Sequence, residues 1–493
     1  MSPKNKLDYM SKHSKANSDL AASNATARFS SYFSLEWKLV LKDRGAILTA
    51  FSLAVVLLVA FWSGKRADQS ETEALHSAAE RVQAEWESQP PRNPHMAAHY
   101  GILVYRPRAP LQAIEPGVLP YQGAVTFLEA HRRNAPVLSP ASVRVAESRY
   151  GGTRFSPMLQ VTAGFLALVL GYLIGAREAQ RAMLLLLRGL GIKGGLRIAA
   201  KALVTGTLVL LAAAPALLLA AFQVDSEDGA VRFLALTAGS FIHLFILAGL
   251  GVAAGTWLGT ARFGLATVAF AWGMGVLILP RIIDVAAEQI IPLTQREINE
   301  VIAADFAEGP DGHGNTEANK VFEQEILKQY GVERKEDLPV NFDALLMQAD
   351  EEHRGKVYDL RLAEADARRK RQDRIRRISW IFGPTPAMLD LSVRIAGADA
   401  GTQRRFDQAA ETFRRDLVSR LNNHMATNSR TGDWEWTPDD EYYASFTAFN
   451  PPQHKLTDNL NDVLPATIAL GLWGLLMLGS LVIVAKRFNH NPL

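Results

Sequence analysis

Two histidines four residues apart are the first side chains in this 493-residue sequence whose types and spacing could do chemistry. His95 and His99 stand in the stretch HMAAH. On a helix they would share one face and could both bind a metal ion. However, Pro94 and its proline-rich surroundings favour a loop and a coincidental pair, and no carboxylate or cysteine nearby completes a set of ligands. The sequence therefore predicts no metal ion and no other cofactor.

A third histidine, His243, lies inside a long apolar stretch. An ionisable group in hydrocarbon is costly and usually faces the interior of a helix bundle. A neutral histidine that is hydrogen-bonded to a neighbouring helix is the simpler interpretation. The alternative is an intramembrane polar site with a role in binding protons or substrate.

No catalytic or nucleotide-binding motif is present in the sequence. GLGIKGG at residues 189–195 is not a phosphate loop, because no Ser or Thr follows its lysine and no strand precedes it. The sequence has no cysteine, which excludes disulfides, zinc–thiolate sites and cysteine nucleophiles. No Ser-His-Asp pattern can be assigned. We expect that the chain is not an enzyme and that any ATP it uses is hydrolysed by a separate subunit.

Six apolar stretches are long enough to cross a membrane, which takes roughly 20 mostly apolar residues. They are residues 46–64, 158–176, 202–222, 233–258, 263–283 and 463–485. The fold class is therefore a mainly α membrane protein with six transmembrane helices. Because 53 Lys and Arg residues nearly balance 50 Asp and Glu residues, no overall field favours nucleic acid as a partner.

Lys and Arg residues in the short connections predict that both termini lie in the cytoplasm, since short cytoplasmic loops carry an excess of these residues. Eight of them precede residue 46, six lie in segment 177–201, and two lie in the tail 486–493. By contrast, the connection 223–230 has three acidic residues and no Lys or Arg.

The two long polar stretches then form extracytoplasmic domains. Residues 65–156 begin with a helical pattern and continue with short β-prone runs between prolines, which predicts a mixed α/β domain. Residues 284–462 are expected to be mostly helical. Their basic run at 368–377 is typical of a solvated helix face, with a site for an anionic ligand or a lipid headgroup as the alternative.

The segment before the first span has the make-up of a helix that lies in the membrane interface. Residues 1–27 are expected to be a disordered cytoplasmic leader, and residues 28–45 an elbow helix. The residues of this helix that carry the prediction are Glu36, Trp37 and Arg44. The alternative is a simple extension of the first span.

Segment 177–201 combines basic residues with four consecutive leucines between two spans. A short amphipathic helix, a glycine-rich turn and a second basic turn fit this pattern. Such a segment presents a cytoplasmic surface to a partner.

From about Ala27 onwards the sequence resembles the permease subunits of ABC type-2 exporters. In that family the connection between spans 2 and 3 forms a coupling helix that docks on a separate ATPase. Glu178 matches the family's acid, Leu184–Leu187 match its leucines, and Lys201 matches its final lysine. Residues 181–183 and 190–192 depart from the family's Gly-Thr-Leu and Ser-x-Pro. The resemblance implies ATPase-coupling contacts at Glu178, Arg181, Leu184, Leu187, Arg188 and Lys193.

The order of the motifs resembles a subgroup with insertions after span 1 and before span 6. The stretch SLEWKLVLKDRGAILTAF, residues 109–121 and residues 384–422 carry this likeness. It implies two permease subunits, identical or paralogous, with two ATPase subunits in a bacterial inner membrane. The chain would then be an exporter permease without catalytic residues of its own.

Two other functions compete with export. The large insertions also fit a mechanotransmission or assembly subunit, which couples ATP hydrolysis to extracytoplasmic partners without moving cargo. An ion-coupled transporter is less favoured, because the spans contain no carboxylate between their ends.

Overall fold

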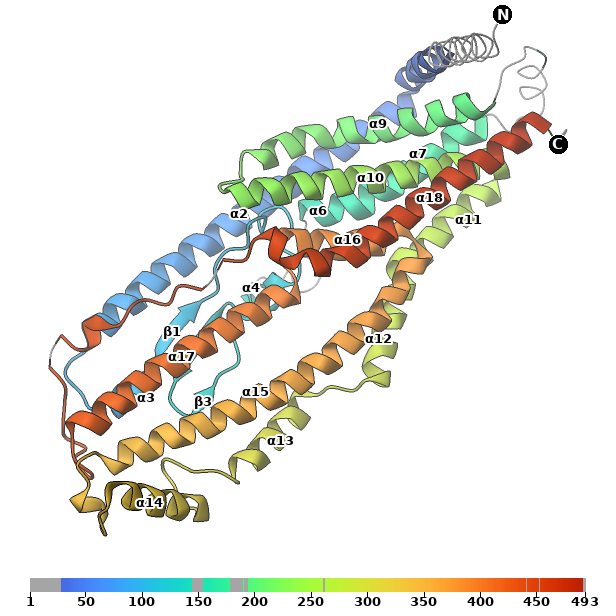
Figure 1. Cartoon of the computed structure of the whole chain (residues 1–493). Coiled ribbons are helices and arrows are strands. Elements are labelled where there is room, and N and C mark those ends of the chain that lie inside the picture. The colour runs from blue at the N-terminus through green and yellow to red at the C-terminus, as the bar shows by residue number, and fades with distance from the viewer. Residues whose placement is uncertain are drawn as a thin grey trace, which may run out of the picture.

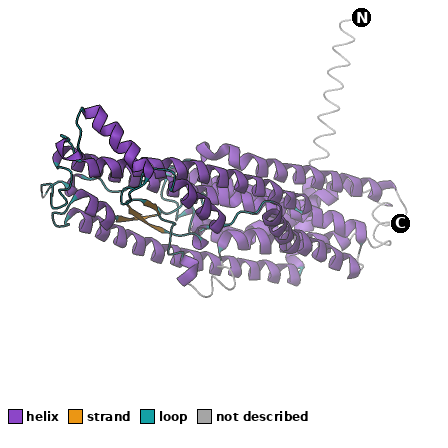
Figure 2. Ribbon diagram, turned by 90° about the horizontal axis from the view of Figure 1, so that it is seen from below, coloured by secondary structure: helices purple, strands orange, loops and turns teal. Residues whose placement is uncertain are grey.

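A computed structural model describes residues 28–143, 154–177, 189, 194–259, 262–439, 441–451 and 453–490. Helices dominate this part of the chain, and the strands are confined to one half of an elongated molecule (Figures 1 and 2). Six of the described helical segments are long and apolar enough to cross a membrane. Each overlaps one predicted span, which confirms a mainly α fold that is compatible with a multi-pass membrane protein. The segments are Arg44–Glu87, Phe155–Ala176, Gly194–Ala221, Glu227–Leu258, Phe263–Phe306 and Leu456–Arg487.

The spans are built from named helices as follows: α2 (Arg44–Glu87), α6 (Phe155–Pro157), η2 (Met158–Ala163), α7 (Gly164–Ala176), α9 (Gly194–Ala221), α10 (Glu227–Leu258), α11 (Arg262–Gly273), η4 (Met274–Ile278), α12 (Leu279–Ile290), α13 (Gln295–Phe306) and α18 (Leu460–His490). A further helix covers residues 28–42. It lies at the same end of the bundle as the last turns of α18 (Figure 1).

Helix α2 runs without interruption from the first span into the following polar stretch. Its 44 residues begin after Asp43, whose side chain accepts hydrogen bonds from the backbone N–H groups of Gly45 and Ala46. At 1.5 Å per residue the helix is about 66 Å long, roughly twice the thickness of a hydrocarbon core. The span predicted at 46–64 and the helical pattern that follows it are therefore one rigid element.

Glycines allow α7 and α10 to approach each other closely. A Cβ atom at Gly171 would overlap the carbonyl oxygen of Ala248, and one at Gly255 would overlap that of Tyr172. Small residues at such positions let two helix backbones meet, which is a common way to pack helices in membranes. These two spans form the centre of the bundle.

The remaining elements lie mostly at the other end of the molecule. They are α3 (Pro94–Tyr100), β1 (Ile102–Tyr105), η1 (Leu119–Tyr121), β2 (Val125–Glu129), β3 (Arg132–Arg133), α4 (Pro140–Val143), α14 (Glu317–Tyr330), η5 (Lys335–Asp337), α15 (Phe342–Arg376), η6 (Arg377–Phe382), α16 (Pro384–Ala396), α17 (Ala400–Asn428), η7 (Tyr443–Ser445) and η8 (Leu456–Asn459). The three strands form an antiparallel sheet in the order β1-β2-β3.

The two polar stretches pack against each other and share a core. Trp86 at the end of α2 and Leu128 of β2 are buried in one cluster with Phe406 and Leu421 of α17. The sequence predicted two domains, whereas the structure has one unit built from both, which lies at the end opposite residues 28–42 (Figure 1). We call residues 65–143, 295–376 and 400–451 the distal unit.

Helix α16 belongs to the bundle and not to the distal unit. Met388 and Leu391 are buried in the same core as Leu244 of α10. Arg232 of α10 is 1% exposed, and its Nη1 donates a hydrogen bond of 2.8 Å to the carbonyl oxygen of Ile395. One short helix of the polar stretch 284–462, α16, therefore packs among the apolar helices of the bundle.

Candidate metal centre

Helix α3 places His95 and His99 on one face. Asn93 caps the helix, since its Oδ1 accepts a hydrogen bond of 2.9 Å from the backbone N–H of His95. Pro94 occupies the first helical position, where its missing N–H costs no hydrogen bond and its fixed φ favours the helix. The expected loop at this position is wrong because the proline begins a helix. The two rings consequently lie one helical turn apart.

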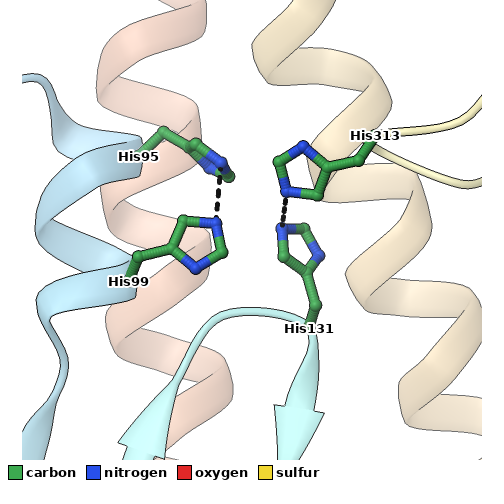
Figure 3. Close-up of side chains that lie close together, drawn as sticks. All are labelled: His95, His99, His131 and His313. Atoms are coloured by element: carbon green, nitrogen blue, oxygen red, sulfur yellow. Dashed lines mark hydrogen bonds between the residues drawn. The ribbon is translucent and has the colours of Figure 1, made fainter.

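Two further histidines come from distant parts of the chain. His131 lies in the turn between β2 and β3 and has a positive φ of 62°. His313 lies in the loop between α13 and α14, where Asp311 Oδ1 accepts a hydrogen bond of 3.0 Å from its backbone N–H. Figure 3 shows that the four rings point toward one common space.

The four rings are close enough for their nitrogens to share one ion. The Nε2 atoms of His95 and His99 are 3.0 Å apart, and those of His131 and His313 are 3.1 Å apart. All four possible ligand atoms lie within 4.8 Å of one another. In a tetrahedral site with metal–nitrogen bonds of about 2.0–2.1 Å, the nitrogens are about 3.3–3.4 Å apart. The cluster therefore needs only small movements to reach that geometry.

Carboxylates orient His131 from behind. The Oδ2 atom of Asp350, which is 1% exposed, lies 2.7 Å from Nδ1 of the ring. The backbone N–H of His131 donates to Glu351, and Glu351 also accepts a hydrogen bond of 2.8 Å from Arg414. A carboxylate that accepts from Nδ1–H keeps the proton there, so the lone pair of Nε2 faces the other rings.

Burial favours the neutral form of His95, His99 and His313. Burial lowers the pKa of His95 to about 3, and it lowers the pKa values of His99 and His313 as well. The neighbouring rings act in the same direction, because a second positive charge beside them is unfavourable. A neutral imidazole is the form that binds a metal ion.

The composition of the cluster indicates which ions it suits. Four imidazoles without a carboxylate favour borderline transition metals such as zinc, copper, nickel or cobalt over magnesium or calcium. Four protein ligands fill a tetrahedral coordination shell, which is typical of a site that holds its ion. Since His95 and His131 are buried and His313 is exposed, an ion would enter from the side of the loop 307–316.

Two of the three predicted elbow residues, Glu36 and Trp37, connect helix 28–42 to the bundle, whereas Arg44 lies outside this helix. Glu36 is buried, and its Oε2 accepts a hydrogen bond of 2.9 Å from Nζ of Lys201 on α9. Trp37 stacks on Phe33 and packs against the core of the bundle. Arg44 is the exposed first residue of α2.

The predicted coupling residues lie outside the described residues. They are Glu178, Arg181, Leu184, Leu187, Arg188 and Lys193.

His243 is fully buried in α10, and its Nε2 lies 3.0 Å from Oγ1 of Thr385 on α16. The prediction of a hydrogen bond to a neighbouring helix is confirmed. The partner helix comes from the stretch that the sequence placed outside the membrane.

One family model matches part of the chain. It is described as a domain of unknown function (DUF3526) and covers residues 293–445. No curated protein and no solved structure matches the chain. The matched segment contains His313 and the carboxylates Asp350 and Glu351, whereas the other three histidines of the centre precede it.

Proposed function

We propose that the distal unit binds one divalent transition-metal ion through His95, His99, His131 and His313. The convergence of four Nε2-bearing rings from three separate segments carries this proposal. If the four histidines only stabilised the fold, hydrogen bonds from their rings to backbone groups would be sufficient. Here the rings face one another, and Asp350 holds the ring of His131 in the orientation that a metal ligand needs.

The number of bound ions tests the proposal. The full chain is purified in detergent, stripped with EDTA and dialysed against Zn²⁺, and the zinc content is measured by mass spectrometry. We expect one ion per chain, and none in the double variant His99→Ala/His313→Ala. His76→Ala is the matched control, because this side chain is 72% exposed on α2 and lies outside the cluster. Equal zinc content in the double variant and the wild type would contradict the proposal.

We further propose that the chain is a permease subunit of an ATP-binding cassette exporter in a bacterial inner membrane. A separate ATPase would dock on segment 177–201, and two permeases, identical or paralogous, would pair. The six apolar helices and the sequence resemblance support this assignment. The distal unit then lies outside the cytoplasm, with both termini inside.

The contact between Glu36 and Lys201 supports a route for coupling. Lys201 is the last residue of the proposed docking segment and already lies on α9, and its ammonium group pairs with the buried Glu36 of helix 28–42. Arg197, one turn earlier on α9, lies 3.4 Å from the same carboxylate. A movement of the segment would therefore be transmitted to both helices together.

Transport and mechanotransmission differ in what crosses the membrane. The chain is reconstituted in vesicles together with any ABC ATPase that is encoded beside it, and ATP hydrolysis and zinc flux are measured together. Zinc flux that requires ATP would support an exporter with the metal ion as cargo. ATP hydrolysis without zinc flux would favour a subunit that acts on extracytoplasmic partners. In that case the metal ion would stabilise the fold of the distal unit. If the chain does not bind the ATPase, both the exporter and the mechanotransmission function are contradicted.

A further inference from the structure

A large cavity lies beside the histidine centre within the distal unit. Its volume is about 1240 Å³, and it is open to solvent and lined by α13, α15, α17 and the edge of the sheet at β3. In Figure 1 these elements run side by side along the distal half of the molecule. Pockets for small molecules are typically about 300–1,000 Å³, so the space suits a ligand of considerable size.

The cavity extends along most of α15. Its lining runs from Arg354, in the first half of that helix, to Arg377, directly after its last residue. At 1.5 Å per residue these positions are about 35 Å apart. One end reaches His131, and the other reaches Arg394 of α16 and Asp462 at the start of α18. The cavity therefore joins the histidine centre to the level at which the spans begin.

The lining carries an excess of positive charge. Eleven Lys and Arg residues and seven Asp and Glu residues line it. Some of the cations are neutralised by acids, since Arg394 pairs with Asp390, and Arg414 with Glu411. Such pairs hold the walls together and leave little charge for a ligand.

Three cations at the end near the spans have no acidic partner among the described residues. Lys370, Arg374 and Arg377 follow at spacings of four and three, which places them on one face of the same helical run. All three line the cavity. Arg377 lies over the ring of Trp380, and its buried Nε has no hydrogen-bond partner in the described part of the chain. This end of the cavity offers unsatisfied donors to an anion.

We infer that the cavity binds a small polyanion that carries several carboxylate or phosphate groups. Guanidinium groups bind both kinds of anion with two parallel hydrogen bonds, and the charge of Arg377, which is half-buried, is screened less than that of an exposed residue. A bare divalent cation does not fit this end, because the excess of positive charge repels it. The inference rests on the cavity and holds whether or not the histidines take a metal ion.

Binding of two soluble probes tests the inference. Citrate and pyrophosphate are titrated by calorimetry into the full chain in detergent. We expect saturable binding of at least one of them that weakens as salt is raised. The variant Lys370→Gln/Arg374→Gln/Arg377→Gln is expected to bind at least tenfold more weakly. The matched control is Arg368→Gln/Arg371→Gln, at two residues of the same helix that do not line the cavity, and its affinity is expected to stay within about threefold of the wild type.

Two further measurements make the result decisive. An anionic phospholipid that copurifies with the wild type and is lost in the triple variant would support the inference, with a lipid phosphate as the source of the anion. Folding is checked by circular dichroism and by the zinc content, and Arg374→Gln alone replaces the triple variant where that variant does not fold. Absence of both probe and lipid binding, or equal binding by the cavity variant and the exposed control, would overturn the inference. A wild-type chain that binds the anion but holds no zinc would contradict the proposed metal centre and would leave the inference about the cavity intact.

Discussion

The carboxylate of Asp350 lies 2.7 Å from Nδ1 of His131, although 219 residues separate the two in sequence. This contact fixes the ring so that Nε2 faces the three other histidines of the centre. Arg354, one turn further along α15, is also bonded to Asp350 and keeps the carboxylate in place. Helix α15 thus acts on the centre without supplying a ligand to it.

Replacing Asp350 should weaken metal binding without removing a ligand. The substitution Asp350→Asn keeps an oxygen acceptor but removes the negative charge that makes the ring a better ligand. We expect zinc affinity to fall about 10–100-fold, which is typical of a lost outer-shell partner. Competition with a chromophoric chelator measures the change. Glu352→Gln, at an exposed neighbouring position, serves as the control. Equal affinities in the two variants would argue against an orienting role.

The buried carboxyl of Glu115 should make stability depend on pH. It is 1% exposed and accepts hydrogen bonds from Ser392 Oγ at 2.8 Å and from the backbone N–H of Gly117 at 3.2 Å. Burial raises its pKa above the usual 4.5, since the charged form is poorly solvated. The unfolded chain therefore loses this proton first, and stability falls as the pH rises from 4.5 through the raised folded-state pKa.

Glu115→Gln removes this titration and should raise the unfolding temperature at pH 8. We expect this gain to shrink as the pH falls and to be absent at pH 4.5. Differential scanning fluorimetry at both pH values measures it. Glu80→Gln, at a side chain that is 70% exposed, should change neither value. If Glu115→Gln instead lowers the unfolding temperature, and more so at pH 8 than at pH 4.5, the predicted direction of the pH dependence is wrong.

The close approach of α7 and α10 should be sensitive to a single methyl group. Gly255→Ala places a Cβ atom against the carbonyl oxygen of Tyr172, so the helices must separate. Overpacking of this kind typically costs about 1–3 kcal/mol. Gly479→Ala on α18 adds the same methyl group where nothing lies within 4 Å. The first variant should unfold at a lower temperature than the wild type and the second should not. Equal unfolding temperatures would contradict the packing.

The proposed ATPase docking is tested by reversing charge in the coupling segment. Arg181→Glu/Arg188→Glu should weaken association with the ATPase or uncouple ATP hydrolysis while membrane insertion stays intact. Copurification and ATPase activity in vesicles measure this. Lys12→Glu/Lys15→Glu in the leader makes the same charge change elsewhere and should have little effect. Normal ATPase binding and normal coupling of ATP hydrolysis in Arg181→Glu/Arg188→Glu would contradict docking on this segment.

The sequence predicts the spans and the long polar helices because their signals are local. An apolar stretch of about 20 residues identifies a span by itself, and helical spacing predicts a common face for four apolar residues, Phe406, Phe413, Leu417 and Leu421. The structure has six helical segments of the required length and apolarity among its described residues, and the four residues of the face pack in one cluster. The return of α16 to the bundle has no such signal, because a helix of 13 residues is too short to be recognised as part of a membrane bundle.

The histidine centre likewise cannot be predicted from local sequence patterns. His95 and His99 are visible as a pair, but His131 and His313 are 182 residues apart and meet only because the two polar stretches share a core. Each is one isolated histidine in a turn, which carries no information about its partners. The position of Pro94 was the one local clue, since proline at a first helical position favours the helix that aligns the pair.

X-ray absorption at the zinc edge of the loaded full-length protein tests the metal centre most directly. We expect four nitrogen neighbours at about 2.0–2.1 Å, with the outer scattering of imidazole rings. The spectrum of His313→Ala should show one nitrogen replaced by a light ligand such as water. A wild-type spectrum with two or fewer imidazoles, or one dominated by oxygen at longer distances, would contradict a four-histidine site.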